Sequence, residues 1–276
     1  MTDEYYLKIH SHSCLEIRVN DTSILFDPWI NGSAYWRSWW NFPEPTPLVN
    51  LIDSLSSCKN IFIYITHLHW DHFHGPTLRK LNKQIPNVKF LISRTPEIRL
   101  KTDLMEVLNK SSHIEEINHQ ETYKIDAQIS LKPFLSGPIL TDSAVLIKIN
   151  NDFILNLNDS KQQFLMMNQI INSVGDGNLK VMLRSHSSAN SRICLKNRDG
   201  SRRQNNDKDK ETYSIDFLNA ASYLKPHLAI PFASNMCYLH KDSMQYNEHS
   251  NTSDLLYKYH LTSKEYSPVN LQLVLP

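Results

Sequence analysis

The chain has 276 residues, of which 41% are hydrophobic and 21% are charged, and its formal net charge is +1. This composition is typical of a globular protein with an apolar core, and the near-zero charge gives no electrostatic reason to expect binding to nucleic acid or to an anionic membrane. The start, MTDEYYLKIH, lacks the basic and apolar regions of a signal peptide, and no stretch approaches 18 consecutive apolar residues. The four scattered cysteines have no CxxC spacing, which is typical of reduced thiols. We therefore expect a cytoplasmic protein that does not bind a membrane.

Taken in chain order, the predicted elements begin with strands and then alternate between helix and strand. Runs of apolar β-branched residues predict strands, and amphipathic stretches with proline or polar residues at their ends predict helices. The expected strands cover residues 5–10, 15–19, 23–26, 61–65, 88–92, 113–117, 122–125, 129–134, 143–149, 153–158, 179–183, 228–232 and 270–275. The expected helices cover residues 76–83, 96–109, 162–174, 213–224 and 253–259. This order predicts two packed sheets with helices outside, in a single domain over residues 1–276.

Two stretches do not fit a strand or helix pattern. Residues 29–47 are rich in aromatic residues and proline, which predicts a long loop. Residues 196–211 are dominated by charged residues and have no hydrophobic period, so we expect an exposed and poorly ordered loop there.

The sequence ITHLHWDHFHG, residues 65–75, concentrates potential metal ligands directly after a predicted buried strand. His67, His69, Asp71 and His72 follow that strand within a few residues, and the carboxyl ends of strands in α/β sheets are where ligands bind. Imidazole and carboxylate are the ligands that zinc and iron(II) prefer. Two ions about 3.5–4 Å apart can clamp a reacting oxygen and supply a hydroxide nucleophile at neutral pH. His74 lies in the same stretch but is a weaker candidate.

The pattern His67-x-His69-x-Asp71-His72, with Gly75 shortly after it, resembles the signature of the metallo-β-lactamase fold superfamily. The resemblance implies an αββα sandwich in which two mixed sheets pack together with helices outside. The segments His12-Ser13-Cys14 and Ile24-Leu25-Phe26-Asp27-Pro28-Trp29 resemble the opening of one subgroup. It contains the ascorbate-6-phosphate lactonase-like proteins and the metallo-β-lactamase domain of CMP-N-acetylneuraminate hydroxylase.

The resemblance implies further ligands outside the signature. ILNLNDS, residues 154–160, resembles the strand that delivers a metal-bridging aspartate, which makes Asp159 the candidate; the alternative is that Asp159 caps the next helix. The last histidine ligand of the superfamily follows a late strand, and we expect it to be His240, with His227 as a weaker candidate. His12 and His186 are expected to contact substrate.

The chain departs from the superfamily in one respect. The superfamily supplies another histidine after the strand corresponding to residues 129–134, where this chain has Leu135-Ser136-Gly137. His113 and His119 precede that strand. Either His119 reaches the site from elsewhere, or one metal is bound weakly or is absent. An open coordination shell would also suit iron that must bind oxygen.

The aromatic loop allows two interpretations. Tyr35, Trp36, Trp39, Trp40 and Phe42 crowd around Arg37, and these rings either pack over the edge of the fold or form a lid beside the metals. In the second case we expect Trp36 to stack on substrate and Arg37 to pair with its phosphate or carboxylate.

Together these features predict a metallo-hydrolase that acts on a small anionic or ester-like substrate through a metal-bound hydroxide. One or two ions, zinc or alternatively iron, would be held by His67, His69, Asp71, His72, Asp159 and His240, and Asp71 would direct a proton. One alternative is an iron oxygenase related to the sialic-acid hydroxylase, which would need a redox partner protein because no Cys/His set for a Rieske cluster is present. Another is a binding protein with a degenerate metal site.

Overall fold

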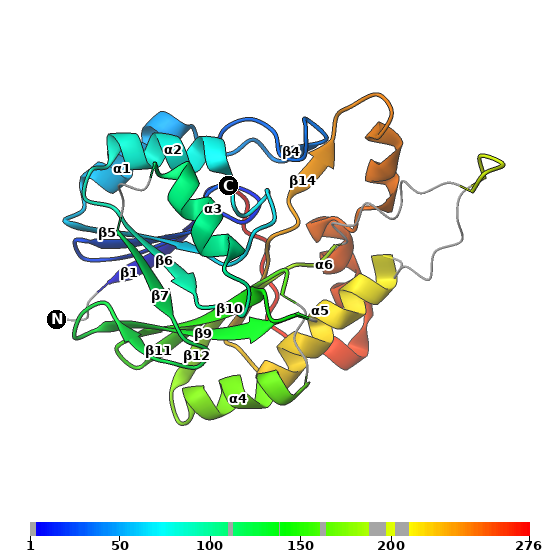
Figure 1. Ribbon diagram of the computed structural model, residues 1–276. Helices are drawn as coiled ribbons and strands as arrows, with labels where there is room; N and C mark the ends of the chain where they lie inside the picture. Colours follow the sequence, from blue (N-terminus) through cyan, green and yellow to red (C-terminus); the bar gives the residue numbers. More distant parts are fainter. Residues whose placement is uncertain (1–3, 110–112, 138, 161–163, 188–196, 202–209) are drawn as a thin grey trace.

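The protein folds into two six-stranded sheets packed face to face, with helices on both outer surfaces (Figure 1). The computed structural model describes residues 4–109, 113–137, 139–160, 164–187, 197–201 and 210–276. The first sheet has the order β1-β2-β3-β5-β6-β7, formed by β1 (Tyr5–Ile9), β2 (Leu15–Val19), β3 (Thr22–Phe26), β5 (Asn60–Ile65), β6 (Lys89–Ser93) and β7 (Ile114–Ile117). The second has the order β13-β12-β11-β10-β9-β8, formed by β13 (Leu228–Pro231), β12 (Asn178–Arg184), β11 (Asp152–Asn158), β10 (Asp142–Ile149), β9 (Ile129–Ser136) and β8 (Tyr123–Lys124).

Helices cover the outer face of each sheet (Figure 1). On the first sheet lie α1 (Leu48–Ser56), α2 (Gly75–Gln84) and α3 (Arg99–Val107), and on the second lie α4 (Phe164–Val174), α5 (Lys210–Leu224) and α6 (Ser253–Thr262). Short 3-10 helices at Met244–His249 and Lys264–Tyr266 precede and follow α6. A small two-stranded sheet pairs β4 (Trp39–Asn41) with β14 (Met236–Tyr238). The αββα arrangement expected from the sequence is confirmed.

The apolar runs of the central strands explain this layering. Phe26 and Tyr64 of the first sheet pack in one buried cluster with Ile154 and Leu183 of the second, which forms the core between the sheets. Alternate side chains of the same strands point outward, where Ile63, for example, packs in a second cluster with residues of α1, α2 and α3. A strand buried on both faces reads as a continuous hydrophobic run, as in NIFIYI of β5.

Strand direction brings several loops to one end of both sheets. β3 and β5 are parallel, so both end at the same edge. β11 and β12 are also parallel and run antiparallel to β10, so the ends of β11 and β12 lie beside the start of β10. The turn between β1 and β2 is at the same end of the first sheet as the end of β3, because each of these strands pairs antiparallel with its neighbour. The candidate site lies at this shared end.

Several differences from the sequence-based elements concern the less regular parts of the chain. Residues 48–56 form α1, although no helix was expected there; its buried residues Leu51 and Leu55 are spaced for one helix face. Residues 270–275 do not form the expected strand and contribute only an isolated bridge from Leu271 to Ala229. Within the charged stretch 196–211, residues 197–201 are exposed and α5 begins at Lys210, while the others lie outside the described residues.

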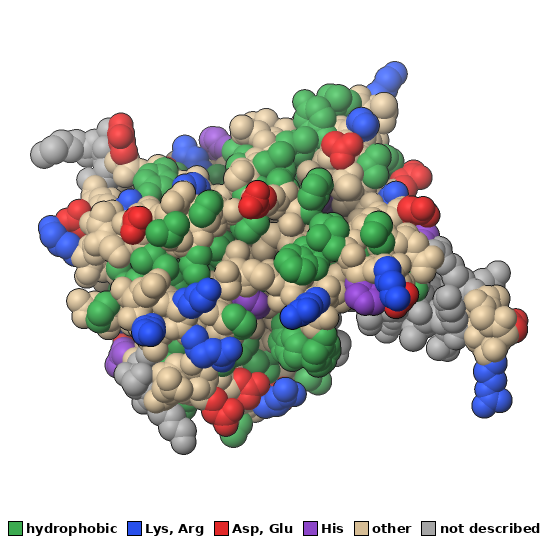
Figure 2. All heavy atoms as spheres, turned by 90° about the horizontal axis from the view of Figure 1, so that it is seen from above, with side chains coloured by type: hydrophobic (Ala, Val, Ile, Leu, Met, Phe, Trp, Pro, Cys, Tyr) green, Lys and Arg blue, Asp and Glu red, His purple; other side chains and the backbone are tan. Residues whose placement is uncertain are grey.

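The surface carries no extended patch of one charge sign on the face shown in Figure 2, where cationic, anionic and apolar side chains alternate. Within the described part of the chain, no helix is both long enough and apolar enough to cross a bilayer.

Candidate metal centre

The buried carboxylate of Asp27 fixes the loop of residues 66–72, which carries His67, His69, Asp71 and His72. Asp27 directly follows β3 in a left-handed conformation (φ 42°), which aspartate tolerates better than most residues. Its Oδ1 accepts the backbone N–H of Thr66 at 2.8 Å, and its Oδ2 accepts the Thr66 hydroxyl at 2.6 Å. The same Oδ2 lies 2.9 Å from Nδ1 of His72, which fixes the tautomer and directs Nε2 of that ring into the cluster.

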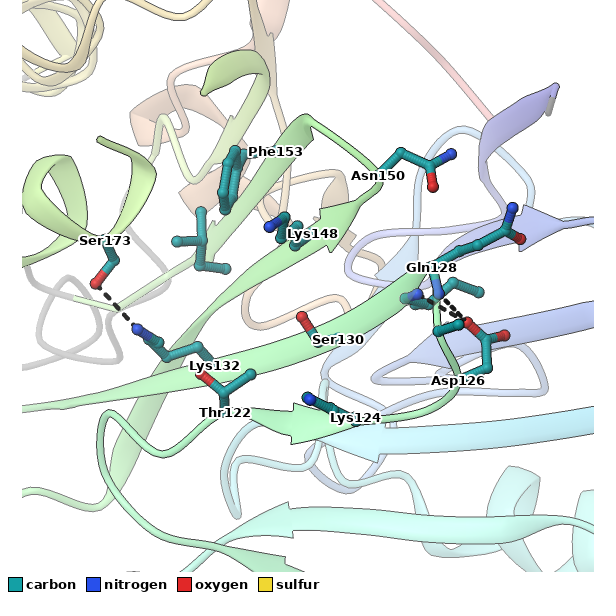
Figure 3. A pocket seen from close by; sticks show the side chains of 13 residues that line it. Thr122, Lys124, Asp126, Gln128, Ser130, Lys132, Lys148, Asn150, Phe153 and Ser173 are labelled. Atoms are coloured by element: carbon teal, nitrogen blue, oxygen red, sulfur yellow. Dashed lines mark hydrogen bonds between the residues drawn. The ribbon is translucent and has the colours of Figure 1, made fainter. Parts of the chain in front are cut away.

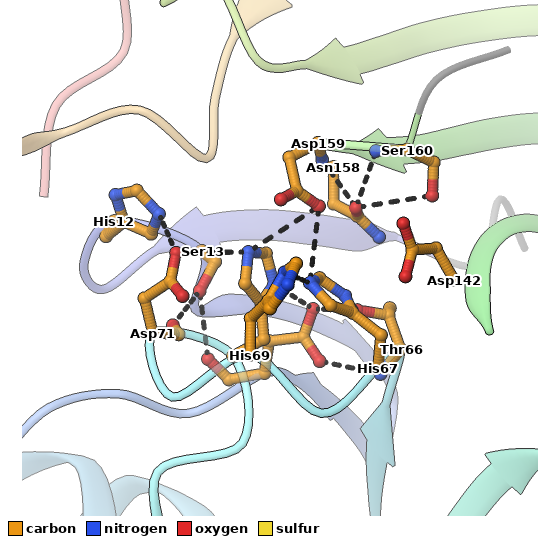
Figure 4. Close-up of polar contacts among 12 residues, drawn as sticks. His12, Ser13, Thr66, His67, His69, Asp71, Asp142, Asn158, Asp159 and Ser160 are labelled. Atoms are coloured by element: carbon orange, nitrogen blue, oxygen red, sulfur yellow. Dashed lines mark hydrogen bonds and ion pairs between the residues drawn. The ribbon is translucent and has the colours of Figure 1, made fainter. Parts of the chain in front are cut away.

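His67, His69 and Asp159 form the first group of potential ligands, with one donor atom of each within 4.8 Å of the others. Nε2 of His67 is 2.8 Å from Nδ1 of His69 and 3.6 Å from Oδ1 of Asp159. Two strand ends supply these side chains, since the histidines follow β5 and the aspartate follows β11 (Figure 4).

Asp159 is presented by a tight turn that its neighbour Asn158 stabilises. Asn158 has a left-handed backbone (φ 41°), and its Oδ1 accepts the backbone N–H groups of both Asp159 and Ser160 (Figure 4). Its Nδ2 donates to the carbonyl of Ser143 at 3.0 Å and so ties the turn to β10. None of the described contacts makes Asp159 a helix cap, because the described part of α4 begins only at Phe164.

His12, Asp71 and His72 form the second group, and all three are buried. Oδ2 of Asp71 is 3.1 Å from Nε2 of His12 and 3.5 Å from Nε2 of His72. His12 comes from the turn between β1 and β2. It was expected to contact substrate, but the structure brings it among the potential ligands. The sequence feature that could have indicated this role is the position of His12 in the turn that lies beside the end of β3.

Asp159 connects the two groups. Its Oδ1 lies 3.7 Å from Nε2 of His72 as well as 3.6 Å from Nε2 of His67. Oδ1 of Asp159 and Nε2 of His72 are buried and have no hydrogen-bond partner among the described residues, and the same is true of Nδ1 of His12. Buried polar atoms are rarely left unsatisfied without a functional reason. Two atoms each about 2.1 Å from one ion lie about 3.4 Å apart at the tetrahedral angle, so these spacings and this donor set fit zinc or iron(II).

The pKa values of His72 and Asp71 reflect the closeness of several ionisable groups in the cluster. Burial opposes protonation of His72, but the carboxylates of Asp159, Asp71 and Asp27 outweigh it and raise the pKa of His72 to about 10. Burial would raise the pKa of the Asp71 carboxyl, but His72 and the hydrogen bonds from His12 and Tyr35 hold that pKa well below its usual range. The cluster without metal therefore concentrates negative charge that a cation neutralises.

His186 lies near His12 but outside both groups of potential ligands, and His240 lies outside both groups as well. His186 directly follows β12, the parallel neighbour of β11, and is buried, and its Nδ1 has no hydrogen-bond partner among the described residues. Burial and then the nearby His12 lower the pKa of His186 to about 3, which keeps the ring neutral as a ligand requires. The ring of His240 is about half exposed and lies 3.6 Å from Asp242. Pairing of β14 with β4 carries the chain away from the sheet end before residue 240, so the structure does not bring His240 into either group.

The aromatic loop reaches the cluster through Tyr35, whose hydroxyl donates to Oδ1 of Asp71 at 2.7 Å. Burial, with the nearby Asp71, raises the pKa of Tyr35 strongly, so the phenol stays protonated. The Trp36 ring is 82% exposed and contacts Trp70 at 4.5 Å between ring centroids. Arg37 is exposed, and no described contact ties its side chain to the cluster. The loop thus meets the cluster through Tyr35, whereas Trp39 packs in a buried cluster with Trp29 and Tyr238.

A carboxylate from the neighbouring strand lies opposite the segment in which the further histidine was expected. Asp142 begins β10 and pairs across the hairpin with Ser136, the last residue of β9. Figure 4 shows its side chain on the His67 side of the cluster, and its charge acts on His67. It lies outside both ligand groups. His119 does not reach the site, because its Nδ1 accepts the backbone N–H of Leu135 and its ring contacts Phe134.

A cavity of about 270 Å³ adjoins the first ligand group, with His67 and His69 in its wall. Its other lining residues are Leu68, Thr95, Glu97, Arg99, Leu100, Ile139, Thr141 and Asp142. A second cavity of about 440 Å³ is lined by Lys124, Lys132 and Lys148 of the second sheet (Figure 3). It includes Ile129 and Asn150, at the opposite end of β9 and β10, and shares no residue with the cluster.

Comparison with known proteins gives one partial sequence match and many fold matches. No protein-family model matches the chain. The cytidine monophosphate-N-acetylneuraminic acid hydroxylase of Cricetulus griseus is 35% identical over 85 residues, which is 31% of this chain and 14% of the hydroxylase. The chain thus matches about a seventh of that relative's length. This match supports the subgroup resemblance noted above.

Several solved structures match over nearly the whole chain, including these three. A variant of the CmlA beta-hydroxylase has a TM-score of 0.62 at 18% identity and covers 100% of this chain and 53% of its own. An isothiocyanate hydrolase from Delia radicum gut bacteria has a TM-score of 0.60 at 9% identity, and the match covers 98% of this chain and 96% of the hydrolase. The metallo-beta-lactamase fold protein YhfI from Bacillus subtilis has a TM-score of 0.56 at 14% identity, and the match covers 95% of this chain and 89% of YhfI. At these identities the likeness concerns the fold, and the chain has the metallo-β-lactamase fold.

Proposed function

We propose that this protein is a metal-dependent hydrolase of a small anionic or ester-like substrate, with two adjacent metal positions. The observation that carries the proposal is the place of Asp159, whose Oδ1 lies within 3.7 Å of a histidine nitrogen in each ligand group. A carboxylate shared in this way is typical of paired metal ions. His67, His69 and Asp159 would hold the first ion, and His12, Asp71, His72 and Asp159 the second.

The bound ions would act as Lewis acids and make a water acidic enough to lose its proton near neutral pH. The protein's own part is to bind substrate, exclude bulk water and receive that proton. Asp71, whose Oδ2 lies 3.1 Å from Nε2 of His12 and 3.5 Å from Nε2 of His72, is the carboxylate proposed to direct that proton. The cavity beside His67 and His69 gives a small substrate room, and the cation in its lining is Arg99, which also lies 3.8 Å from Glu97 and 3.9 Å from Asp103.

An iron oxygenase is the second candidate, and the sequence match to the sialic-acid hydroxylases is the observation that favours it. The same donor set suits iron(II). The cysteines of this chain are too widely spaced for a Rieske cluster, so electrons would have to come from another protein. Metal analysis of protein purified without added metal separates the two candidates. About two zinc ions per chain favour hydrolysis, whereas iron with an oxygen-dependent spectral change favours the oxygenase.

Replacing His69 with alanine tests metal binding itself. We expect H69A to lose at least one ion per chain under chelator challenge, because the ring belongs to the first ligand group. H113A is a matched control, since His113 is an exposed histidine that pairs with Glu115 at 2.8 Å far from the cluster. Equal metal content in H69A, H113A and the parent protein would contradict the assigned site.

A second pair of variants decides between the two late histidines. We propose that His186, rather than His240, completes the second position, because it is buried beside His12 with a free ring nitrogen. H186A should weaken binding of one ion about ten- to a hundredfold or more, while H240A should bind metal like the parent protein. Isothermal titration calorimetry with Zn²⁺ measures the metal affinity of both variants. Loss of metal from H240A alone would restore the sequence-based assignment.

A further inference from the structure

The two oxygens of Asp71 have different surroundings. Oδ2 faces the histidine nitrogens of the second ligand group, at 3.1 Å from His12 and 3.5 Å from His72. Oδ1 points the other way and accepts the hydroxyl of Tyr35 at 2.7 Å. The carboxylate is thereby divided into one oxygen that faces the cluster and one that is occupied by a phenol.

The Tyr35 ring is held firmly in this position by its neighbours. It packs edge to face on Trp39 at 4.6 Å between centroids, and it stacks on Trp70 at 5.9 Å with only 14° between the planes. Trp70 lies between His69 and Asp71 in the chain. The loop that carries Tyr35 is therefore fixed against the same segment that carries the ligands, although 36 positions separate Tyr35 from Asp71.

The backbone that delivers Tyr35 is in an unfavourable conformation. Tyr35, Trp36 and Arg37 all have left-handed backbones, with φ of 48°, 53° and 68°, and none of them is glycine. The turn is closed by a bond from the Ser38 N–H to the Tyr35 carbonyl and by two bonds between Ala34 and Trp39. Bulky residues persist in this region only where the surrounding structure compensates, and such sites cluster where function requires an exact geometry.

We infer that Tyr35 is a positioning residue of the metal centre, whose phenol occupies Oδ1 of Asp71 so that the carboxylate offers Oδ2 alone to the second metal position. The inference rests on the proposed two-metal function. Partners of this kind fix the orientation of a ligand, and their loss typically weakens metal affinity about ten- to a hundredfold. Without the phenol, Asp71 can rotate or use both oxygens, and the second position loses its defined geometry.

Tyr35→Phe tests this inference because it removes only the hydroxyl and keeps the ring contacts with Trp39 and Trp70. We expect titration of the metal-free protein with Co²⁺ to show the first equivalent bound as in the parent protein. The second equivalent should bind about ten- to a hundredfold more weakly, with an altered visible absorption spectrum. Tyr266→Phe is the matched control, since it removes one tyrosine hydroxyl that donates to Asn219 at 2.8 Å away from the cluster.

A double-mutant cycle with Asp71→Asn separates positioning from a general effect on the fold. If Tyr35 acts through Asp71, adding Tyr35→Phe to Asp71→Asn should weaken Co²⁺ binding by less than threefold further. Two ions bound by Tyr35→Phe with unchanged affinity and spectrum would overturn the inference and leave the proposed function standing. A parent protein that binds no Co²⁺ would overturn both.

Discussion

Replacing Asp27 with alanine is expected to lower the free energy of unfolding of the metal-free protein by about 3–5 kcal/mol. Asp27 is fully buried and accepts hydrogen bonds from the Thr66 amide, the Thr66 hydroxyl and the His72 ring. Alanine would leave these buried donors without a partner, each at a cost of about 1–3 kcal/mol before relaxation. Alanine also tolerates the left-handed backbone at this position less well than aspartate does.

Thermal unfolding of the metal-free protein measures this effect, and a loss of that size corresponds to roughly 10 °C in a chain of this length. Asp27→Asn should fall between the parent and the alanine variant, because one amide oxygen can still accept from Thr66 but the amide nitrogen cannot accept from His72. Asp21→Ala is the surface control, since Asp21 is exposed and pairs only with the exposed Lys59, and its melting temperature should not change measurably. An unfolding temperature for Asp27→Ala equal to that control would show that Asp27 does not support the ligand loop.

The part of the site that the sequence predicts well is the part encoded by neighbouring residues. His67, His69, Asp71 and His72 lie within six positions after an apolar run, so a local pattern is enough to place them at a strand end. The order of elements likewise predicts the two sheets, because each strand has its own hydrophobic run. Helix α1 was predictable in principle, since its apolar residues have helical spacing. The proline-rich stretch directly before it, however, gives no clear signal for where the helix begins.

The rest of the site depends on contacts between distant residues. Nothing near Tyr35 in the sequence indicates that its hydroxyl meets Asp71, because the contact follows from the left-handed turn and the stacking on Trp70. His186 and His240 each come after a strand. Only the pairing of β14 with β4 shows that His240 lies away from the shared end of the sheets. The register of β9 with β10 similarly places Asp142 opposite Ser136, a relation that strand prediction alone does not supply.

The second large effect is expected from Asp159→Asn, which should abolish tight binding of both ions at once. The amide carries no charge and bridges poorly, and Oδ1 of Asp159 is the atom common to the two groups. In the metal-free protein the substitution breaks no hydrogen bond of Oδ1 among the described residues, but it removes the carboxylate that lies 3.7 Å from the His72 ring, so each variant is compared with its own metal-free unfolding temperature. Any hydrolytic activity should fall by about a thousandfold or more, which is roughly 4 kcal/mol in the barrier.

The measurement is unfolding temperature with and without Zn²⁺, since a ligand at a hundred times its dissociation constant stabilises the folded state by about 2.7 kcal/mol. The parent protein should gain this stabilisation and Asp159→Asn should not. Asp142→Asn is the matched control, because Asp142 is a neighbouring carboxylate that acts on His67 but lies outside both ligand groups. It should keep two ions, with at most about a tenfold weaker first position, since a charge near an ion affects its binding less than loss of a ligand does. If Asp142→Asn instead loses metal while Asp159→Asn retains it, the shared carboxylate comes from β10 and not from the end of β11.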